Sequence, residues 1–294
     1  MSGIVKSFKG IVKSFIRRFA ITQKSAKILM TAGIILFLML VFFYIFNSFF
    51  GYDPYEITRN ILEPPDSNHI MGTDQLGRDI FSRMCYGTSS SLAIALIASV
   101  ISLIIGAPMG AVSGYFAGPT DRILSVIFDA LYAFPGIILA VLIAVMLGPG
   151  VYTTSIAISV EFIPQYFRVV RGLSLSLKER PFVEAIKALG ARSRNLVFQH
   201  ILVYAVPSIV ALVMLNMGSA ILAVSGLGFL GLGLPPPTPE WGTDLGRGRD
   251  FITMGVWWAS TFPGLMIVIS VVAFTLIGEG LNEMLKTSIS GVKM

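Results

Sequence analysis

Long apolar runs alternate with short polar breaks along most of the 294-residue chain. An apolar helix needs about 20 residues to cross the roughly 30 Å hydrocarbon core of a bilayer. Six runs reach that length, at 27–46, 87–115, 122–147, 151–171, 205–230 and 258–280. The pattern therefore predicts an all-α integral membrane protein with six transmembrane helices.

Composition agrees with this class and narrows the chemistry. Hydrophobic residues make up 54% of the chain and charged residues only 13%, too few to cover the surface of a soluble protein of this length. The single cysteine, Cys85, excludes an intramolecular disulfide and a multi-cysteine metal site. His69 and His200 stand far apart and in no metal-ligand spacing. We expect neither a metal nor a bound cofactor in this chain.

The charges are distributed unevenly among the polar breaks. Residues 1–27 hold seven Lys and Arg and no acid, and the break 172–204 is also predominantly basic, whereas 47–85 is predominantly acidic. Loops rich in Lys and Arg remain in the cytoplasm. We therefore expect both termini and 172–204 on the cytoplasmic side of a multi-pass protein. The net charge of +6 reflects this topology rather than a nucleic-acid partner.

The N-terminal segment is amphipathic. Gly3–Phe8 is repeated at Gly10–Phe15, and its apolar residues share one helical face opposite several lysines. Such a helix lies in the inner leaflet and is attracted to anionic lipid, so membrane lipid is an expected partner.

Within the basic break, Pro181–Gly190 has the features of a short helix. Proline suits the first turn of a helix and glycine suits the residue after its end. The apolar residues between them fall at helical spacing. A compact amphipathic helix at the inner membrane surface fits the groove of a soluble partner.

Sites for chemistry are lacking. The sequence contains no phosphate-binding Gly-x-x-x-x-Gly-Lys-Ser/Thr loop, no His-Glu-x-x-His and no nucleophile elbow. The chain is therefore not expected to be an enzyme. Three classes remain: a transporter whose energy comes from another chain, an ion-coupled secondary transporter that uses Asp129 and Glu161 as a relay, and a membrane scaffold without flux.

Several segments resemble one family of membrane proteins. Glu184-Ala185 followed by Gly190, in a cytoplasmic loop, is similar to the coupling motif of binding-protein-dependent ABC importer permeases. The segments that resemble the second permease of the dipeptide/oligopeptide/nickel subfamily are His69–Arg83, Arg122 with Asp129, Ala133–Pro135, Leu147–Gly150, Leu227–Gly233, Pro236–Gly242 and Trp257–Gly264. The resemblance covers roughly residues 65–285.

The resemblance implies a type I importer permease in the cytoplasmic membrane of a prokaryote. Its implied partners are a homologous permease in a heterodimer, two cytoplasmic ATPases that bind ATP and Mg, and an extracytoplasmic solute-binding protein. The solutes would be di- or oligopeptides, with oligosaccharides or nickel and other metal chelates as alternatives. The implied organisation is a cytoplasmic amphipathic helix (1–26), a first span with an outer loop (27–85), a five-helix core (86–285) containing the coupling loop 172–204, and a tail (286–294).

Three groups of residues are candidate sites. We expect the coupling segment to contact an ATPase through Phe182, Val183, Glu184, Ala185, Ile186 and Gly190. On the outer face, Asp74, Arg78, Asp79 and Trp241 are candidates for contact with the binding protein. The alternative for the first three is a scaffolding role, in which Asp74 or Asp79 caps a helix and an Asp–Arg pair holds the loop. Trp241, Trp257 and Trp258 also fit an aromatic belt at the interface.

The third group lies inside the spans. Asp129 is seven residues from Arg122, so a structural pair on one helix face is expected. Glu161 lies just before Pro164, and it either lines the pathway and meets a cationic part of the solute or hydrogen-bonds backbone groups freed at the proline. Met214, Asn216 and Met217 are further pathway candidates. Glu161 replaces an aromatic residue common in the family, which leaves the solute open.

Overall fold

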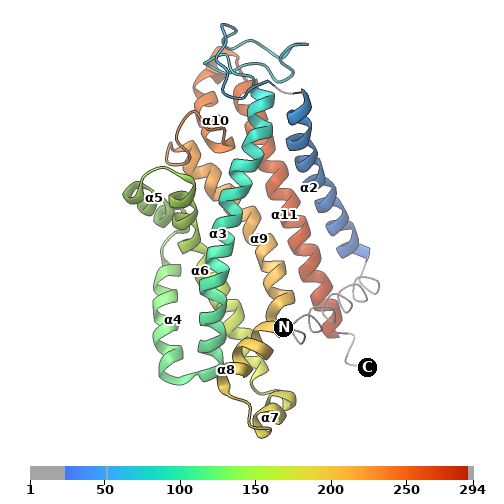
Figure 1. The fold of residues 1–294 in the computed structure, drawn as a ribbon, viewed down its shortest axis with the longest axis vertical. Coiled ribbons are helices and arrows are strands. Elements are labelled where there is room, and N and C mark those ends of the chain that lie inside the picture. The colour runs from blue at the N-terminus through green and yellow to red at the C-terminus, as the bar shows by residue number, and fades with distance from the viewer. Residues whose placement is uncertain (1–23, 51, 291–294) are drawn as a thin grey trace.

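The computed structural model describes residues 24–50 and 52–290, and its fold is helical (Figure 1). The elements are α2 (Lys24–Phe50), α3 (Ile80–Phe116), α4 (Gly118–Ala133), α5 (Gly136–Leu147), α6 (Val151–Leu177), α7 (Pro181–Ala188), α8 (Ser193–Asn195), the π-helix η1 (Leu196–Ile201), α9 (Leu202–Phe229), α10 (Trp241–Gly248), the 3₁₀ helix η2 (Arg249–Met254) and α11 (Trp258–Ser290). The all-α class is confirmed. Most of the expected 1–26 helix and the end of the tail lie outside the described residues.

Four helical segments in the described ranges are long and apolar enough to cross a membrane: 24–46, 80–116, 193–229 and 258–285. Helices α4 and α5 together qualify as a fifth, but they meet at an 89° bend. The predicted continuous span 122–147 is therefore wrong in its shape. The predicted span 151–171 is a helix, α6, of about 40 Å. Because it contains more polar residues, it is not among the four segments that are apolar enough to cross a membrane.

The bend between α4 and α5 has a local cause at Phe134-Pro135. The residue before a proline is disfavoured in helical conformation because the proline ring clashes with it. Phe134 accordingly adopts an extended conformation (φ −77°, ψ 137°), and α5 restarts directly after Pro135. The same apolar run thus forms two short helices that point in different directions.

Helices α3 and α6 pack at close range along a stripe of glycines. Gly106, Gly110 and Gly114 of α3 are spaced by four residues and face the backbone of α6. A Cβ atom at position 110 would lie 2.4 Å from the carbonyl oxygen of Phe167. Small residues at this spacing let two membrane helices approach closely, so this stripe fixes the distance between the two helices.

The helices form an elongated bundle with different structures at its two ends (Figure 1). Helix α2 packs on α11 at one edge, and α4 and α5 lie at the opposite edge. The loop before α3 and helix α10 occupy one end, and α7 projects from the other. The main apolar core joins α3, α6, α9 and α11 between these ends. The candidate coupling and outer-face residues therefore lie at opposite ends of the bundle.

Candidate functional site

Helix α7 lies where the sequence predicts it, and its length is close to the predicted one. Pro181 occupies its first turn, and the helix ends at Ala188. Gly190 follows in a left-handed conformation (φ +84°) that favours glycine. Its N–H donates to the carbonyl oxygen of Lys187 (2.9 Å), which turns the chain back toward the bundle.

The two faces of α7 differ. Val183 is completely buried within the chain, so it anchors the helix rather than offering its surface to another protein, as the sequence had suggested. Phe182 is 39% exposed and stacks on Tyr204 of α9 at a centroid distance of 6.2 Å. Glu184 and Ala185 are exposed, and Ile186 is partly buried. An outward face that combines an aromatic ring with a carboxylate is thus available for docking.

Helix α7 is linked closely to the spans on both sides. Only 178–180 separate it from α6, and the short α8 and the π-helical η1 lead from it into α9. Leu196 and Ile201 of η1 are completely buried. A displacement of α7 would therefore act directly on α6 and α9.

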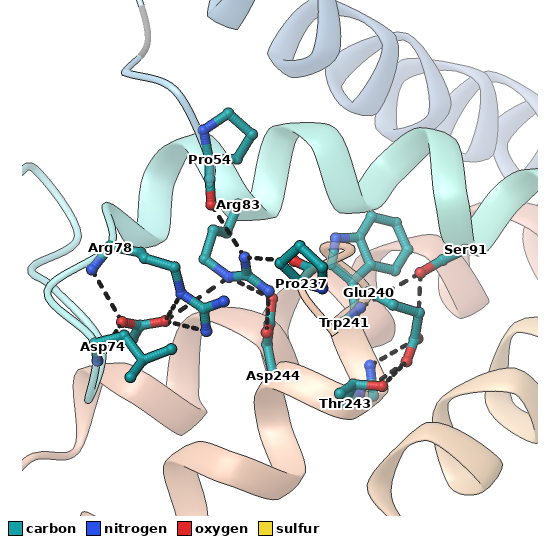
Figure 2. Close-up of polar contacts among 12 residues, drawn as sticks. Pro54, Asp74, Arg78, Arg83, Ser91, Pro237, Glu240, Trp241, Thr243 and Asp244 are labelled. Carbon is teal, nitrogen blue, oxygen red and sulfur yellow. Dashed lines mark hydrogen bonds and ion pairs between the residues drawn. The ribbon is translucent and has the colours of Figure 1, made fainter. Parts of the chain in front are cut away.

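At the opposite end, buried charges join the start of α3 and the loop before it to α10 (Figure 2). Arg83 forms a two-pronged ion pair with Asp244, with Nη2–Oδ1 at 2.6 Å and Nε–Oδ2 at 3.2 Å. Its Nη1 donates to the carbonyl oxygens of Pro54 (3.1 Å) and Pro237 (3.3 Å). One guanidinium group thus connects three segments far apart in the sequence.

The predicted caps and the Asp–Arg pair occupy the same region. The carboxylate of Asp74 accepts hydrogen bonds from the backbone N–H (2.9 Å) and the Nε (2.7 Å) of Arg78. Asp79 caps α3 by accepting from the N–H of Ser82 (2.7 Å), and its other oxygen lies 2.9 Å from Nδ1 of His69. The cap predicted at Asp79 is therefore confirmed.

Glu240 and Trp241 begin α10 and are both completely buried. The Glu240 carboxylate caps the helix by accepting from the N–H groups of Gly242 and Thr243, both at 2.8 Å. Burial raises the pKa of Glu240, and the hydrogen bonds from Gly242 and Thr243 oppose that rise. The indole N–H of Trp241 donates to the carbonyl oxygen of Met84 (3.0 Å).

The four outer-face candidates are thus buried: Asp74, Arg78, Asp79 and Trp241 are at most 7% exposed. Their contacts fit the scaffolding role and leave no surface for a binding protein in this conformation. The aromatic-belt interpretation also fails for Trp241 and for Trp258 (8% exposed), while Trp257 is 51% exposed and suits an interface.

Ion pairs between helices, rather than along one helix, hold α4 against α6. Asp129 pairs with Arg168 at 2.9 Å, and not with Arg122 as the seven-residue spacing had predicted. Asp121 forms a second, two-pronged pair with Arg171, at 2.6 and 2.8 Å. The Asp129 pair is largely exposed on the bundle surface.

Residues of α6 and α9 contribute to the walls of two cavities. One has a volume of about 490 Å³ and is lined by Arg168 and by residues of α9 and α11. The other, about 530 Å³, is lined by residues of α5, α6, α9, α10 and α11, among them Glu161. Met214, Asn216 and Met217 line neither cavity; Asn216 and Met217 are buried in the bundle.

Comparison with known proteins accounts for this architecture. Residues 106–291 match the family model of the binding-protein-dependent transport system inner membrane component. The chain belongs to this family. It is therefore a subunit of a multi-pass membrane transporter rather than an enzyme, and the family implies an ATPase and a binding protein as partners.

Relatives in this permease family are similar over nearly the whole chain. The glutathione transport system permease protein GsiD of Pectobacterium atrosepticum is 36% identical over 93% of this chain and 88% of its own length. The dipeptide transport system permease protein DppC of Alkalihalophilus pseudofirmus is 38% identical over 91% and 88%. The probable D,D-dipeptide transport system permease protein DdpC of Escherichia coli K12 is 35% identical over 91% and 90%.

A solved permease structure has the same fold. A chain of the MetNI methionine ABC transporter in inward-facing conformations superposes with a TM-score of 0.55 at 20% identity, covering 67% of this chain and 93% of that chain. The likeness supports the ABC importer permease fold. Membership of the family also sets aside the ion-coupled transporter and the scaffold that the sequence left open.

Sequence reasoning missed several residues that the permease fold brings together. Arg83 and Asp244 are separated by 161 residues, and no helical spacing relates them. Arg83 ends one of the segments that resemble the subfamily, and Asp244 lies two residues after another, which was the available signal. Arg168 and Arg171 carried a second signal, because arginines in a nominal span require a partner.

Proposed function

We propose that this permease forms the translocation pathway for di- or oligopeptides, or solutes of similar size, that a binding protein delivers and ATP hydrolysis drives inward. The names of three relatives refer to glutathione, dipeptides and D,D-dipeptides, which supports peptides over oligosaccharides and metal chelates. The proposal rests on one observation. Helix α7 projects from one end of the bundle, and the two helices that it joins, α6 and α9, contribute residues to the walls of both cavities.

In this proposal α7 seats in a cleft of an ATPase subunit. Phe182 offers an aromatic surface, and Glu184 in the first turn is favoured by the helix dipole and suits an arginine of the partner. Ala185 allows close approach, Ile186 adds apolar area, and Val183 and Gly190 hold the helix in place. Because α7 is continuous with α6 and α9 through short connections, its movement would change the shape of the cavities between them.

In this proposal the chain also has the complete arrangement of the family. The six-span topology counts α6 and the bent pair α4–α5 as spans and places both termini and 172–204 in the cytoplasm of a prokaryotic cell. Charge supports this orientation, since 172–204 is basic and 47–85 acidic. The exposed apolar residues of α5, such as Ile138 (60% exposed), would face lipid or the homologous permease of a heterodimer. The proposed organisation keeps the boundaries at 26, 85 and 285 and the coupling loop at 172–204.

The coupling role is tested by charge reversal at α7. We expect Glu184→Arg to leave the protein inserted and assembled but to abolish ATP-driven uptake of a labelled dipeptide in proteoliposomes containing the whole transporter. Gly190→Pro should act similarly, because proline cannot adopt a φ of +84°. The matched control is Glu179→Arg, which reverses an exposed acid in the connection just before α7 and should retain uptake. Uptake at the wild-type rate in Glu184→Arg would refute the docking role.

A further inference from the structure

The larger of the two cavities contains polar atoms that the chain itself leaves without partners. Its walls are mainly apolar, and its volume of about 530 Å³ falls within the range of roughly 300–1,000 Å³ typical of small-molecule sites. Among the residues that the structure describes, Glu161 Oε2 and Ser225 Oγ have no hydrogen-bond partner although both atoms are shielded from solvent. Buried polar atoms are normally paired, so the side chains of these two lining residues can each take a further partner.

The side chain of Glu161 lies against the first turn of α5. Its side chain lies directly against Gly136, the first residue of α5, so closely that a Cβ there would come within 2.2 Å of Oε1. The N-terminus of a helix carries a partial positive charge that stabilises a nearby anion. The 89° bend at Pro135 places this helix start against α6. The bend and the glycine thus create the space that the carboxylate occupies.

The cavity lacks a countercharge for this carboxylate. Its lining residues include no Lys, Arg or His, and no ion pair of Glu161 is found in the described part of the chain. The alternative role, hydrogen bonding to backbone groups near Pro164, gains no support from Oε2, which has no partner. An anion in an apolar wall without a cation is costly unless a cationic ligand visits it.

We propose that Glu161 is the recognition residue for a positively charged amino group of the transported solute, with Ser225 as a neighbouring hydrogen-bonding group. A peptide with a free amino terminus, whose pKa is about 7.7–8.0, carries such a charge at neutral pH, whereas a neutral oligosaccharide does not. This inference rests on the proposed function and narrows it: the permease itself selects cationic amino groups in addition to the selection made by the binding protein.

The first test compares two labelled forms of one dipeptide, with a free and with an acetylated amino terminus, in proteoliposomes containing the whole transporter. The wild type should favour the free form, and Glu161→Gln should reduce that preference by about tenfold, the effect of losing one charged hydrogen bond. Glu161→Asp should keep most of the preference. The matched control is Glu279→Gln, which removes an exposed acid of α11 outside the cavity. Because one binding protein serves every variant, the change in preference isolates the permease.

A second measurement tests whether the cavity carries a negative charge, and it does not depend on transport. Leu222 lines the cavity and is 59% exposed, so Leu222→Cys provides a reactive thiol, while the native Cys85 is 1% exposed. A cationic thiosulfonate reagent should modify this thiol about tenfold faster than a neutral one, and adding Glu161→Gln should remove the difference.

The outcomes separate the two proposals. Absence of ATP-driven uptake of both peptide forms by the wild-type transporter would overturn the proposed function and this inference together. Normal wild-type uptake with an unchanged preference in Glu161→Gln would overturn only the inference, as would equal loss of both peptides. Equal reaction of the Leu222→Cys thiol with both reagents would also overturn it.

Discussion

Replacing Arg83 tests how the end of the bundle that contains α10 is held together. In Arg83→Met the Asp244 carboxylate remains buried without its cation; the side chains are only 1% and 9% exposed in the pair. Removing one member of a buried ion pair costs about 3–5 kcal/mol of folding free energy. Two carbonyl oxygens, of Pro54 and Pro237, also lose their donor, and each such hydrogen bond contributes about 1 kcal/mol.

The double variant Arg83→Met/Asp244→Leu separates these contributions. It removes the unpaired carboxylate but not the loss at the two carbonyls, so we expect a deficit of roughly 2 kcal/mol compared with roughly 6 for Arg83→Met alone. Equilibrium unfolding of the detergent-solubilised full chain, followed by tryptophan fluorescence, measures the difference, because Trp241 and Trp258 are buried near this end.

The pH dependence of the single variant supplies an independent check. Burial raises the pKa of Asp244, and the Arg83 charge opposes that rise. Without Arg83 the carboxyl group is most stable when protonated, so the stability of Arg83→Met should fall as pH rises through the raised pKa. The double variant should lack this component. If the double variant is no more stable than Arg83→Met at neutral pH, the unpaired charge is not the cause of the loss.

Three further predictions concern other parts of the fold. Gly110→Ala should push α3 from α6 and lower stability by at least about 1 kcal/mol, whereas Gly172→Ala, where a Cβ meets nothing within 4 Å, should not; equal effects in thermal unfolding would contradict the packing argument. Burial raises the pKa of Glu240, so its contribution to stability is complete below its ordinary pKa and lost as pH rises through the raised one; Glu240→Gln should flatten that slope in unfolding measured across pH. Asp121→Asn should destabilise more than Asp129→Asn, since the second pair is exposed; the reverse order would refute the comparison.

The sequence predicted features that depend on neighbouring residues. The bounds of α7 followed from Pro181 and Gly190, and the cap of α3 followed from Asp79, because such signals act within one turn of helix. The apolar runs also located α2, α3, α9 and α11, which are apolar enough to span, whereas α6 falls outside this group and the run 122–147 is bent by 89°. That bend depends on Phe134-Pro135, which a hydropathy pattern cannot distinguish from an ordinary kink.

Features that depend on the tertiary fold could not be predicted in this way. Asp129 was matched with Arg122 on its own helix, whereas its partner lies on α6. Helical periodicity grouped Val183 with Phe182, but it does not say which apolar side faces the chain itself and which faces a partner. For the same reason the burial of Trp241 was not foreseen, whereas the burial of Asp74 and Arg78 fits the scaffolding alternative that their types and spacing offered.

The length of α3 has a mechanical consequence. Its 37 residues extend about 55 Å, well beyond the roughly 30 Å of hydrocarbon, so it is a strut that reaches from one aqueous layer to the other. Arg83 ties its N-terminal end to α10, and Gly114 packs its C-terminal end against α6, near the start of the proposed coupling loop. A tilt imposed at one end of this helix must therefore reappear at the other, so under the proposed function it would give solute delivery and nucleotide turnover a common axis.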